Sequence, residues 1–234
     1  MKVLLRFSYD GSKFNGFQRQ KNVRSVQKDL EDALSSIYKE DIVIKGAGRT
    51  DALVHAINQY AHFDTTKNIS NVKRLLNSNL SDIKIKSVKK VNDDFHARFS
   101  VKKKVYLYKI TNNKLDNLNY YAYYKNLDYK KIKECLKLFV GDHNFKNFVA
   151  GSRDNYEGTI FSIKTYKLFN KIYIKFTGHG FYRYMVRNIV GASIDYSQGK
   201  VSIKDISNML NKPLIERQLS TAKREGLYLK DVKY

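Results

Sequence analysis

The chain has 234 residues, enough for one large domain or two small domains with hydrophobic cores. Its hydrophobic fraction of 42% and aromatic fraction of 13% exclude a disordered basic tail. Lysine and arginine number 44 against 22 acidic residues, so the formal net charge is +22. Such a charge favours a polyanionic partner, with nucleic acid first. A ribosomal type of basic protein, or a lysine-rich genome, would give a similar excess.

Cysteine content and hydropathy bear on the compartment. Cys135 is the only cysteine, which excludes a disulfide within the chain, and its amphipathic helix pattern predicts a small core residue. No apolar stretch approaches the roughly 18 residues of a membrane span, and a strand pattern follows Met1 where a signal peptide would lie. The sequence therefore predicts a protein of the cytoplasm or of an equivalent reducing compartment.

The first half of the chain alternates strand and helix patterns. Period-two alternation predicts strands, and apolar residues at helical spacing predict helices. In chain order we expect a strand over 2–10, a helix from the Ser25 cap to Ile37, a short strand up to Lys45, a strand over 54–63, a helix capped by Ser70, and a strand over 83–91. This order is β-α-β-β-α-β, the split βαβ arrangement.

The second half repeats that order. We expect a strand over 105–110, a helix over 129–140, a hairpin of 159–169 with 172–176, helices over 181–196 and 203–210, and a closing strand over 227–232. No Gly/Ser/Pro-rich linker separates the halves. The sequence therefore predicts an α+β fold of two similar β-α-β-β-α-β (ferredoxin- or RRM-like) halves, 1–100 and 101–234. We expect their antiparallel sheets to merge and to leave a cleft at the junction.

A loop with two glycines follows the short strand of the first half. Gly46 and Gly48 permit positive φ and close backbone approach, and Arg49 and Asp51 follow them directly. Loops between rigid strands often carry binding and catalytic side chains. Here a carboxylate two residues from a guanidinium could act as a nucleophile. From this stretch alone, a turn aspartate in a loop salt bridge is the favoured interpretation.

Two other segments combine basic and aromatic residues. In the stretch 95–109, cations suited to phosphates interleave with rings that can stack on bases, and Tyr106 and Tyr108 share one face of a strand. Half-buried sheet tyrosines are an equal alternative. Near a helix start, Arg183 and Arg187 lie one turn apart, which suits phosphate or carboxylate recognition. The five histidines form no helical pair and accompany no cysteine cluster, so no metal site is expected.

With these segments in view, the chain resembles the tRNA pseudouridine synthase A family. Residues 48–51 (Gly-Arg-Thr-Asp), followed by 54–56, resemble the signature loop of that family. Four other blocks agree in order: 9–11 with 16–18, 95–98 with 106–108, 185–191, and 225–229. The resemblance extends from Tyr9 to the last strand, which is essentially the whole chain.

The resemblance implies the pseudouridine synthase fold and a cofactor-free isomerase without a metal. It implies conversion of uridine to pseudouridine in the anticodon stem-loop of tRNA, usually by a homodimer. By motif match, Asp51 would be the catalytic nucleophile and Tyr106 would hold the target base. Arg49 and Arg187 would line the pocket. The target base must leave the helical stack to be reached, which phosphate contacts and ring stacking can offset.

The chain departs from the family pattern at three places. Leu53 stands where glycine is usual, Phe17 where tryptophan is usual, and Tyr184 where histidine is common. None of these changes removes a catalytic group, so activity is expected, while another tRNA position or a ribosomal RNA stays an alternative target. A non-catalytic RNA-binding protein and a ribosome-associated structural protein are the alternative functions, and neither needs Asp51 beside Arg49.

Overall fold

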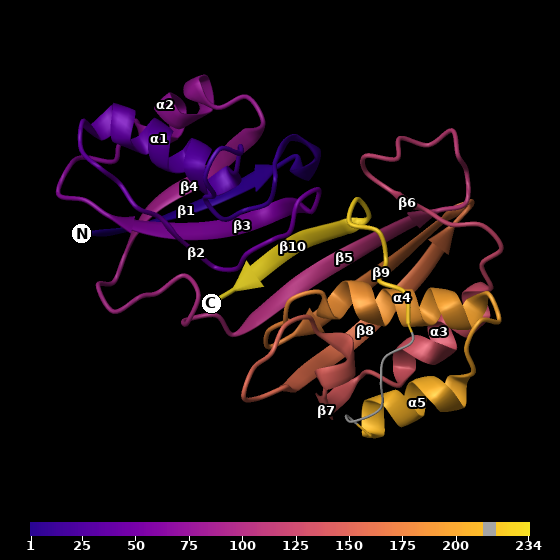
Figure 1. The fold of residues 1–234 in the computed structure, drawn as a ribbon. Coiled ribbons are helices and arrows are strands. Elements are labelled where there is room, and N and C mark those ends of the chain that lie inside the picture. Colours follow the sequence, from indigo (N-terminus) through magenta and orange to yellow (C-terminus); the bar gives the residue numbers. More distant parts are fainter. Residues whose placement is uncertain (213–218) are drawn as a thin grey trace. The chain divides into compact units, whose positions relative to one another are not determined.

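The computed structural model describes residues 1–212 and 219–234 and divides the chain into two compact units (Figure 1). Unit 1 comprises Met1–Lys102 and Tyr228–Tyr234, and unit 2 comprises Lys103–Leu227. The sequence placed the division at residue 100. The structure differs in one respect, because the closing residues from Tyr228 onward group with the first unit.

Unit 1 is built on a sheet with the strand order β4-β1-β3-β10. The strands are β1 (Lys2–Tyr9), β2 (Lys45–Gly46), β3 (His55–Asp64), β4 (Ile83–Val91) and β10 (Leu227–Lys233). Strand β1 is antiparallel to both β3 and β4, the short β2 pairs antiparallel with β3, and β10 runs parallel to β3. The order β4-β1-β3 with β2 on β3 is the split βαβ arrangement that the sequence predicts for the first half.

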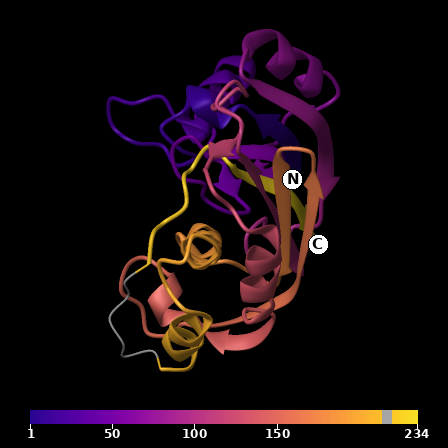
Figure 2. The ribbon, with the colours of Figure 1, turned by 90° about the vertical axis from the view of Figure 1, so that its right-hand side faces the viewer.

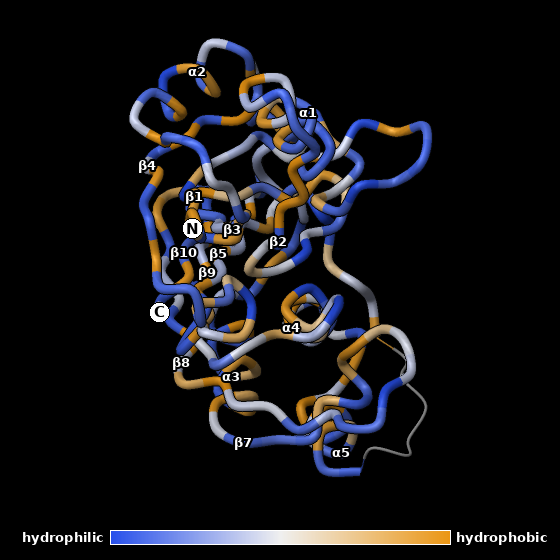
Figure 3. The backbone as a smooth tube through the Cα atoms, turned by 90° about the vertical axis from the view of Figure 1, so that its left-hand side faces the viewer, coloured by the Kyte–Doolittle hydropathy of each residue, from blue (hydrophilic) through white to orange (hydrophobic). Residues whose placement is uncertain are grey.

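Helices α1 (Val26–Tyr38) and α2 (Val72–Asn79) cover one face of this sheet, and a short 3₁₀ helix, η1 (Gly11–Lys13), follows β1 (Figure 1). Alternation decides which strand residues meet the helices: Val3, Leu5 and Phe7 of β1 have no exposed surface. The tube of α1 carries both hydrophobic and hydrophilic stretches, as a helix on a sheet requires (Figure 3). The predicted Ser25 cap is confirmed, since the Ser25 side chain accepts from the Lys28 backbone N–H. The predicted Ser70 cap was wrong, because α2 has Asn71 at its N-cap position, without a capping side-chain bond.

The strand expected up to Lys45 is shorter than predicted. Ile42 and Ile44 are buried, yet only Lys45 and Gly46 pair with a neighbouring strand. Side chains of α1 take the two isoleucine N–H groups instead, because Ser35 Oγ accepts from Ile42 at 3.0 Å and Glu31 Oε1 from Ile44 at 3.1 Å. These two bonds satisfy the backbone without a ladder.

Unit 2 has the strand order β5-β9-β8-β7. Its strands are β5 (Lys103–Thr111), β6 (Ala122–Tyr123), β7 (Gly141–Asn144), β8 (Glu157–Leu168) and β9 (Lys171–Gly178). Its helices are α3 (Tyr129–Lys137), α4 (Met185–Ser197), α5 (Ile203–Asn211) and the 3₁₀ helix η2 (Lys146–Phe148). Helices α3, α4 and α5 lie on one side of the β8–β9 hairpin (Figure 2). The predicted class, two α+β halves, is confirmed.

Helix α4 begins later than the sequence predicts. A helix was expected over 181–196, whereas α4 starts at Met185. Tyr184 precedes it with φ 65°, a left-handed conformation that a right-handed helix cannot include. Arg183 therefore lies outside the helix, and the expectation that it shares a helical face with Arg187 was wrong.

The closing strand predicted over 227–232 is present as β10. Strand β10 pairs with β3, with Tyr228 opposite His55 and Leu229 opposite Ala56. The rings of Tyr228 and His55 stack, with centroids 4.5 Å apart and planes at 15°.

Within the described residues, no helix is long and apolar enough to cross a bilayer.

Candidate active site

The glycine-hinged loop of the sequence analysis connects β2 to β3 in unit 1. Asp51 is partly exposed and Arg49 exposed, whereas Thr50 between them is buried. The Val54 N–H donates to the Asp51 carbonyl at 3.2 Å, which closes a turn with Leu53 at its third position. Leu53 has φ 67°, a conformation that favours glycine.

Thr50 anchors this loop from both its side chain and its backbone. Its hydroxyl lies 2.7 Å from the Tyr9 hydroxyl, and its carbonyl accepts from the Phe17 N–H at 3.0 Å. Burial raises the pKa of Tyr9 to about 12, so the phenol keeps its proton at neutral pH. The residue between Arg49 and Asp51 is therefore fixed, which limits the directions that their side chains can take.

Glycines allow the backbone of neighbouring segments to lie against the loop. A Cβ on Gly11 would lie 2.3 Å from the Val54 carbonyl oxygen, and one on Gly16, which has φ 98°, would lie 3.0 Å from the Thr50 oxygen. On the other side, a Cβ on Gly46 would lie 2.5 Å from the Phe17 ring. The blocks at 9–11 and 16–18 thus support the loop that carries Asp51.

His55 fixes the exit of the loop. Its Nδ1 accepts from the Gly11 N–H at 3.0 Å and lies 3.3 Å from Asp10 Oδ1. Asp10 Oδ1 also accepts from the Ser12 N–H and so caps η1. These contacts, with the stacking of His55 on Tyr228, make His55 part of the framework.

In unit 2, the two tyrosines of β5 differ in their surroundings. Tyr106 is 9% exposed and meets Phe181 edge to face, with centroids 5.2 Å apart and planes at 80°. Tyr108 is fully buried, and its hydroxyl donates to the Lys223 carbonyl at 2.6 Å. Burial raises the pKa of Tyr108 well above its ordinary value. Tyr108 is therefore a structural residue, which leaves Tyr106 as the candidate.

Arg187 lies in the first turn of α4 and is 6% exposed. Its Nε donates to the Ala222 carbonyl at 2.8 Å, and its own carbonyl accepts from the Ala222 N–H at 3.1 Å. The guanidinium carbon lies 4.9 Å from the centroid of the Tyr184 ring. A buried cation held on one edge by a carbonyl and on its face by a ring has a defined direction.

The segment 220–223 crosses α4 and carries the Ala222 carbonyl. Asp195 Oδ2 accepts from the Ser220 N–H at 2.7 Å, and the Thr221 hydroxyl donates to Asn188 Oδ1 at 2.8 Å. A Cβ on Gly191 would lie 1.8 Å from the Ser220 carbonyl oxygen, so only glycine admits this crossing. The sequence analysis missed Asp195. The available signal was a carboxylate among the apolar residues of the helical pattern over 185–197.

The predicted site residues therefore fall into two pairs. Arg49 and Asp51 share the loop of unit 1, whereas Tyr106 and Arg187 belong to unit 2. Arg183 is exposed, with its guanidinium carbon 5.1 Å from the Tyr184 ring centroid. Among the described residues, no group of three or more His, Cys, Asp and Glu side chains is placed to hold a metal ion.

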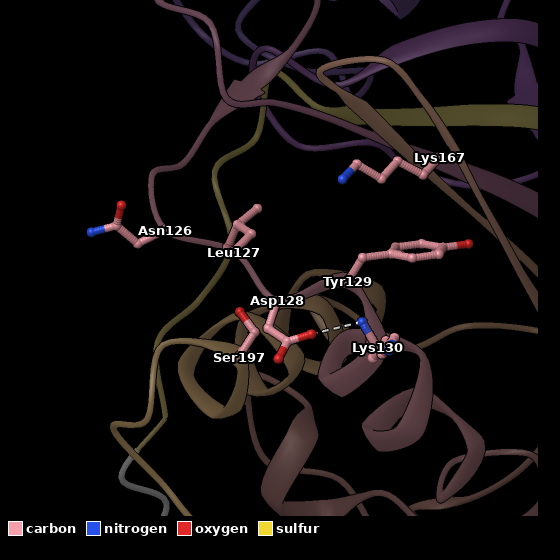
Figure 4. Close-up of a pocket in the computed structure, with 7 residues that line it drawn as sticks. All are labelled: Asn126, Leu127, Asp128, Tyr129, Lys130, Lys167 and Ser197. Atoms are coloured by element: carbon pink, nitrogen blue, oxygen red, sulfur yellow. Dashed lines mark hydrogen bonds between the residues drawn. The ribbon is translucent and has the colours of Figure 1, made fainter.

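A shallow depression in unit 2 offers no comparable chemistry. It is lined by Asn126, Leu127, Asp128, Tyr129, Lys130, Lys167 and Ser197 (Figure 4). Its carboxylate is engaged, because Asp128 Oδ1 accepts the backbone N–H groups of Lys130 at 2.8 Å and Lys131 at 3.2 Å as the cap of α3. The depression contains no activated nucleophile.

Comparison with known proteins identifies the family. A family model described as tRNA pseudouridine synthase matches residues 6–100 and 135–234. A protein of Malacoplasma penetrans called tRNA pseudouridine synthase A is 37% identical over 98% of this chain and 98% of its own length. A protein of the same name from Mycoplasmoides gallisepticum is 38% identical over 99% of this chain and 90% of its own length.

The fold and the matched regions define an isomerase of the pseudouridine synthase class. More particularly, the chain belongs to the tRNA pseudouridine synthase family. The resemblance and the enzyme class that the sequence predicts are thereby confirmed. The reaction of this family is the isomerisation of uridine to pseudouridine in tRNA.

Proposed function

We propose that this chain isomerises uridine to pseudouridine in the anticodon stem-loop of tRNA, with the Asp51 carboxylate as nucleophile. The observation that carries the proposal is the support of the loop. Thr50 forms hydrogen bonds with Tyr9 and Phe17, and the Val54 carbonyl packs against Gly11. Asp51 lies between Thr50 and Val54, which are both fixed, so its carboxylate can be held beside one reacting carbon. Such positioning can lower the activation free energy by several kcal/mol.

The proposed reaction is balanced without any added group. An Asp51 oxygen bonds to C1′ of the ribose as the C1′–N1 bond breaks, and the uracil leaves with the electron pair. The base turns, C5 bonds to C1′, and the carboxylate is released. A proton then leaves C5 and a proton is taken up at N1, so the product is an isomer of the substrate. Removal of the C2′ proton to give a glycal is the alternative first step.

The other three residues bind and orient in this proposal. Tyr106 lies in β5 with its ring against Phe181, and it would hold the detached uracil and relay the C5 proton. The fixed guanidinium of Arg187 would stabilise negative charge that develops as the base leaves. The exposed Arg49 would help to displace the uridine from its stack. These three roles, like that of Asp51, are the ones that the sequence resemblance implies for the extruded uridine.

The charge of the chain supports a large RNA partner. With a net charge of +22, association with phosphates is favoured over the whole substrate and not only at the target base. A homodimer and the anticodon stem-loop are the assembly and the target that the sequence resemblance implies, and both are kept here as proposals. The cytoplasmic location stays a prediction.

The direct test uses undermodified tRNA and three proteins. Wild type, Asp51→Asn and the control Asp41→Asn, which changes an exposed aspartate of the same unit, are incubated with the RNA. Pseudouridine is then mapped by carbodiimide-blocked primer extension. We expect wild type and Asp41→Asn to modify the anticodon stem-loop, and Asp51→Asn to bind the RNA without modifying it.

Each other outcome has a defined meaning. Equal modification by wild type and Asp51→Asn would reject Asp51 as the nucleophile. Modification elsewhere in tRNA would keep the reaction and replace the target. Binding without modification of tRNA or ribosomal RNA by any of the proteins would favour a non-catalytic RNA-binding protein.

A further inference from the structure

The block at 95–98 is part of the family resemblance, yet the proposed reaction assigns it no role. The residue after it, Phe99, is 75% exposed. An aromatic ring that stays exposed to water contributes little hydrophobic free energy to folding. A binding partner that covers the ring would remove this surface from water.

The backbone below Phe99 is held firmly. His96 Nδ1 accepts from the Arg98 N–H at 3.1 Å and from the Phe99 N–H at 3.4 Å. The His96 N–H donates to Ser100 Oγ at 3.0 Å, and the Ser100 N–H donates to the His96 carbonyl at 2.9 Å. The exposed ring is thus carried by a turn with several internal bonds, and its position is defined.

The same turn is anchored to the sheet of unit 1. The Ala97 N–H donates to Nδ1 of His62 in β3 at 3.1 Å, and the Ala97 carbonyl accepts from the hydroxyl of Tyr234 at 2.9 Å. The His62 and His96 rings meet at 4.7 Å and 72°. A rigid strand therefore supports the exposed ring from behind.

Cations lie beside the ring. The guanidinium carbon of Arg98 is 5.6 Å from the Phe99 centroid, and the His96 ring lies 4.4 Å from it at 31°. Burial lowers the pKa of His96, and the charges of Lys45, Lys2 and Arg98 lower it further. The surroundings of Phe99 are therefore positive, and we name His96, Arg98 and Phe99 the aromatic platform.

We propose that the aromatic platform binds tRNA, with an unpaired base stacked on Phe99 and an adjacent phosphate on Arg98. Single-stranded nucleic acids are bound by this combination of ring and cation, because every base has a π-face beside a charged backbone. The cations around Phe99, which are Arg98, Lys2 and Lys45, favour the phosphates of RNA over a second copy of this chain as the occupant of this patch. The proposal rests on the proposed function only in taking tRNA as the RNA.

The aromatic platform lies away from the loop that carries Asp51. His55 at the start of β3 adjoins the loop of Asp51, and His62 under the platform is seven residues further along the same strand. A strand rises about 3.4 Å per residue, which separates the two points by about 24 Å. The platform therefore contributes to binding of whole tRNA and not to the chemical step.

The chain contains no tryptophan, so Phe99→Trp introduces a single tryptophan at the platform, which can be excited selectively beside the 18 tyrosines. We expect undermodified tRNA to quench its emission at the RNA concentrations that saturate binding by filter retention. Phe169→Trp is the matched control, because Phe169 is 87% exposed between β8 and β9. Its emission should not change. An unchanged emission of Phe99→Trp while RNA binds would overturn the proposal, as would a change that depends on protein concentration without RNA.

Kinetics provide the second arm. Phe99→Ala should raise KM for full-length tRNA about 5- to 100-fold with kcat unchanged, and Phe99→Tyr should restore KM. KM for an isolated 17-nucleotide anticodon stem-loop should be unaffected. If Phe99→Ala had the same KM for full-length tRNA as wild type, the platform would be rejected and the proposed function would stand. If wild type modifies no RNA, the proposed function fails and the fluorescence arm still decides the platform.

Discussion

Leu53 occupies a left-handed backbone conformation directly after the proposed nucleophile. Its φ of 67° is costly for a residue with a Cβ, by about 1–2 kcal/mol, and more so for a β-branched residue. This explains on physical grounds why glycine suits the position. In this chain the conformation is imposed by the turn that the Asp51–Val54 bond closes.

The strain at Leu53 gives a prediction from a pair of variants. Leu53→Val should lower the free energy of unfolding by about 1–2 kcal/mol, because a β-branched side chain fits this φ poorly. Leu53→Gly should stay within about 1 kcal/mol of wild type, because the relief of strain offsets the greater entropy of the unfolded chain. Urea titrations measure both. Equal destabilisation by the two changes would show that side-chain contacts, and not φ, decide the residue.

His62 gives a prediction on pH. Burial lowers its pKa from 6.5 to about 4, and its Nδ1 accepts from the Ala97 N–H, so the folded protein contains the neutral ring. Between pH 6.5 and 4 the unfolded chain binds the extra proton, and stability therefore falls as the pH falls through this window.

The amide oxygen of an asparagine could accept the same N–H without titrating. Between pH 6.5 and 5, wild type should therefore lose up to about 2 kcal/mol more stability than His62→Asn, by urea titration at each pH. The His96 ring meets that of His62, so the difference between the two proteins reports the titration of His62 together with its coupling to His96. Parallel loss of stability in the two proteins would contradict the assignment.

Sequence patterns single out the proposed site residues more readily than the residues that position them. Asp51, Arg49 and Arg187 belong to motifs, and their polar side chains are unusual for their surroundings. Asp195 and Thr221 act through contacts between segments that are distant in the chain. Spacing along the chain carries no information on such contacts, so the sequence could not assign these residues.

At the scale of elements, the crossing of the 220–223 segment over α4 is the feature most open to test. Alanine at Gly191 would ordinarily favour a helix by about 1 kcal/mol. Here its Cβ would lie 1.8 Å from the Ser220 carbonyl oxygen, so the segment must move and its bonds to Asp195 and Arg187 must weaken.

Gly191→Ala should therefore destabilise the protein by about 1–3 kcal/mol and lower kcat by more than 10-fold, because Arg187 loses its partner. Gly180→Ala is the control for stability, since a Cβ there meets nothing within 4 Å, and it should change stability by less than about 1 kcal/mol. Thermal unfolding and pseudouridine formation measure the two effects. A stabilised, fully active Gly191→Ala would contradict the positioning of Arg187.

Most helices and strands followed from periodicity, whereas the short strands β6 and β7 were not predicted. Two further exceptions share a cause. The early part of the predicted 181–196 helix is not helical because Tyr184 adopts positive φ, which hydropathy does not encode. The predicted strand up to Lys45 loses its first residues because α1 side chains satisfy Ile42 and Ile44. Both exceptions depend on contacts from outside the element.

At the scale of the whole molecule, the chain ends in the unit in which it began. Strand β10 runs parallel to β3, and Leu229 is 1% exposed. The sequence predicted this strand but not its partner, because alternation fixes which face of a strand is buried and not which neighbour it pairs with.

Leu229→Ala should lower the free energy of unfolding by about 2–4 kcal/mol. Hydrogen exchange should then accelerate first in β3 and β1 of unit 1, over 160 residues away in the chain. Leu136→Ala is the matched control, because it removes a buried leucine of α3 in unit 2. In this variant, hydrogen exchange should accelerate first in unit 2. Loss of protection confined to unit 2 after Leu229→Ala would contradict the division of the chain.

The central claim is that Asp51 breaks the bond between ribose and uracil. When the base rejoins through C5, the hydrogen on that carbon must leave, so tRNA carrying tritium at C5 of its uridines reports each turnover. With enzyme in excess, wild type should release tritium to water, and Asp51→Asn should release it at least about 1,000-fold more slowly while binding the RNA within about 5-fold of wild type. Release by Asp51→Asn at the wild-type rate would contradict the account.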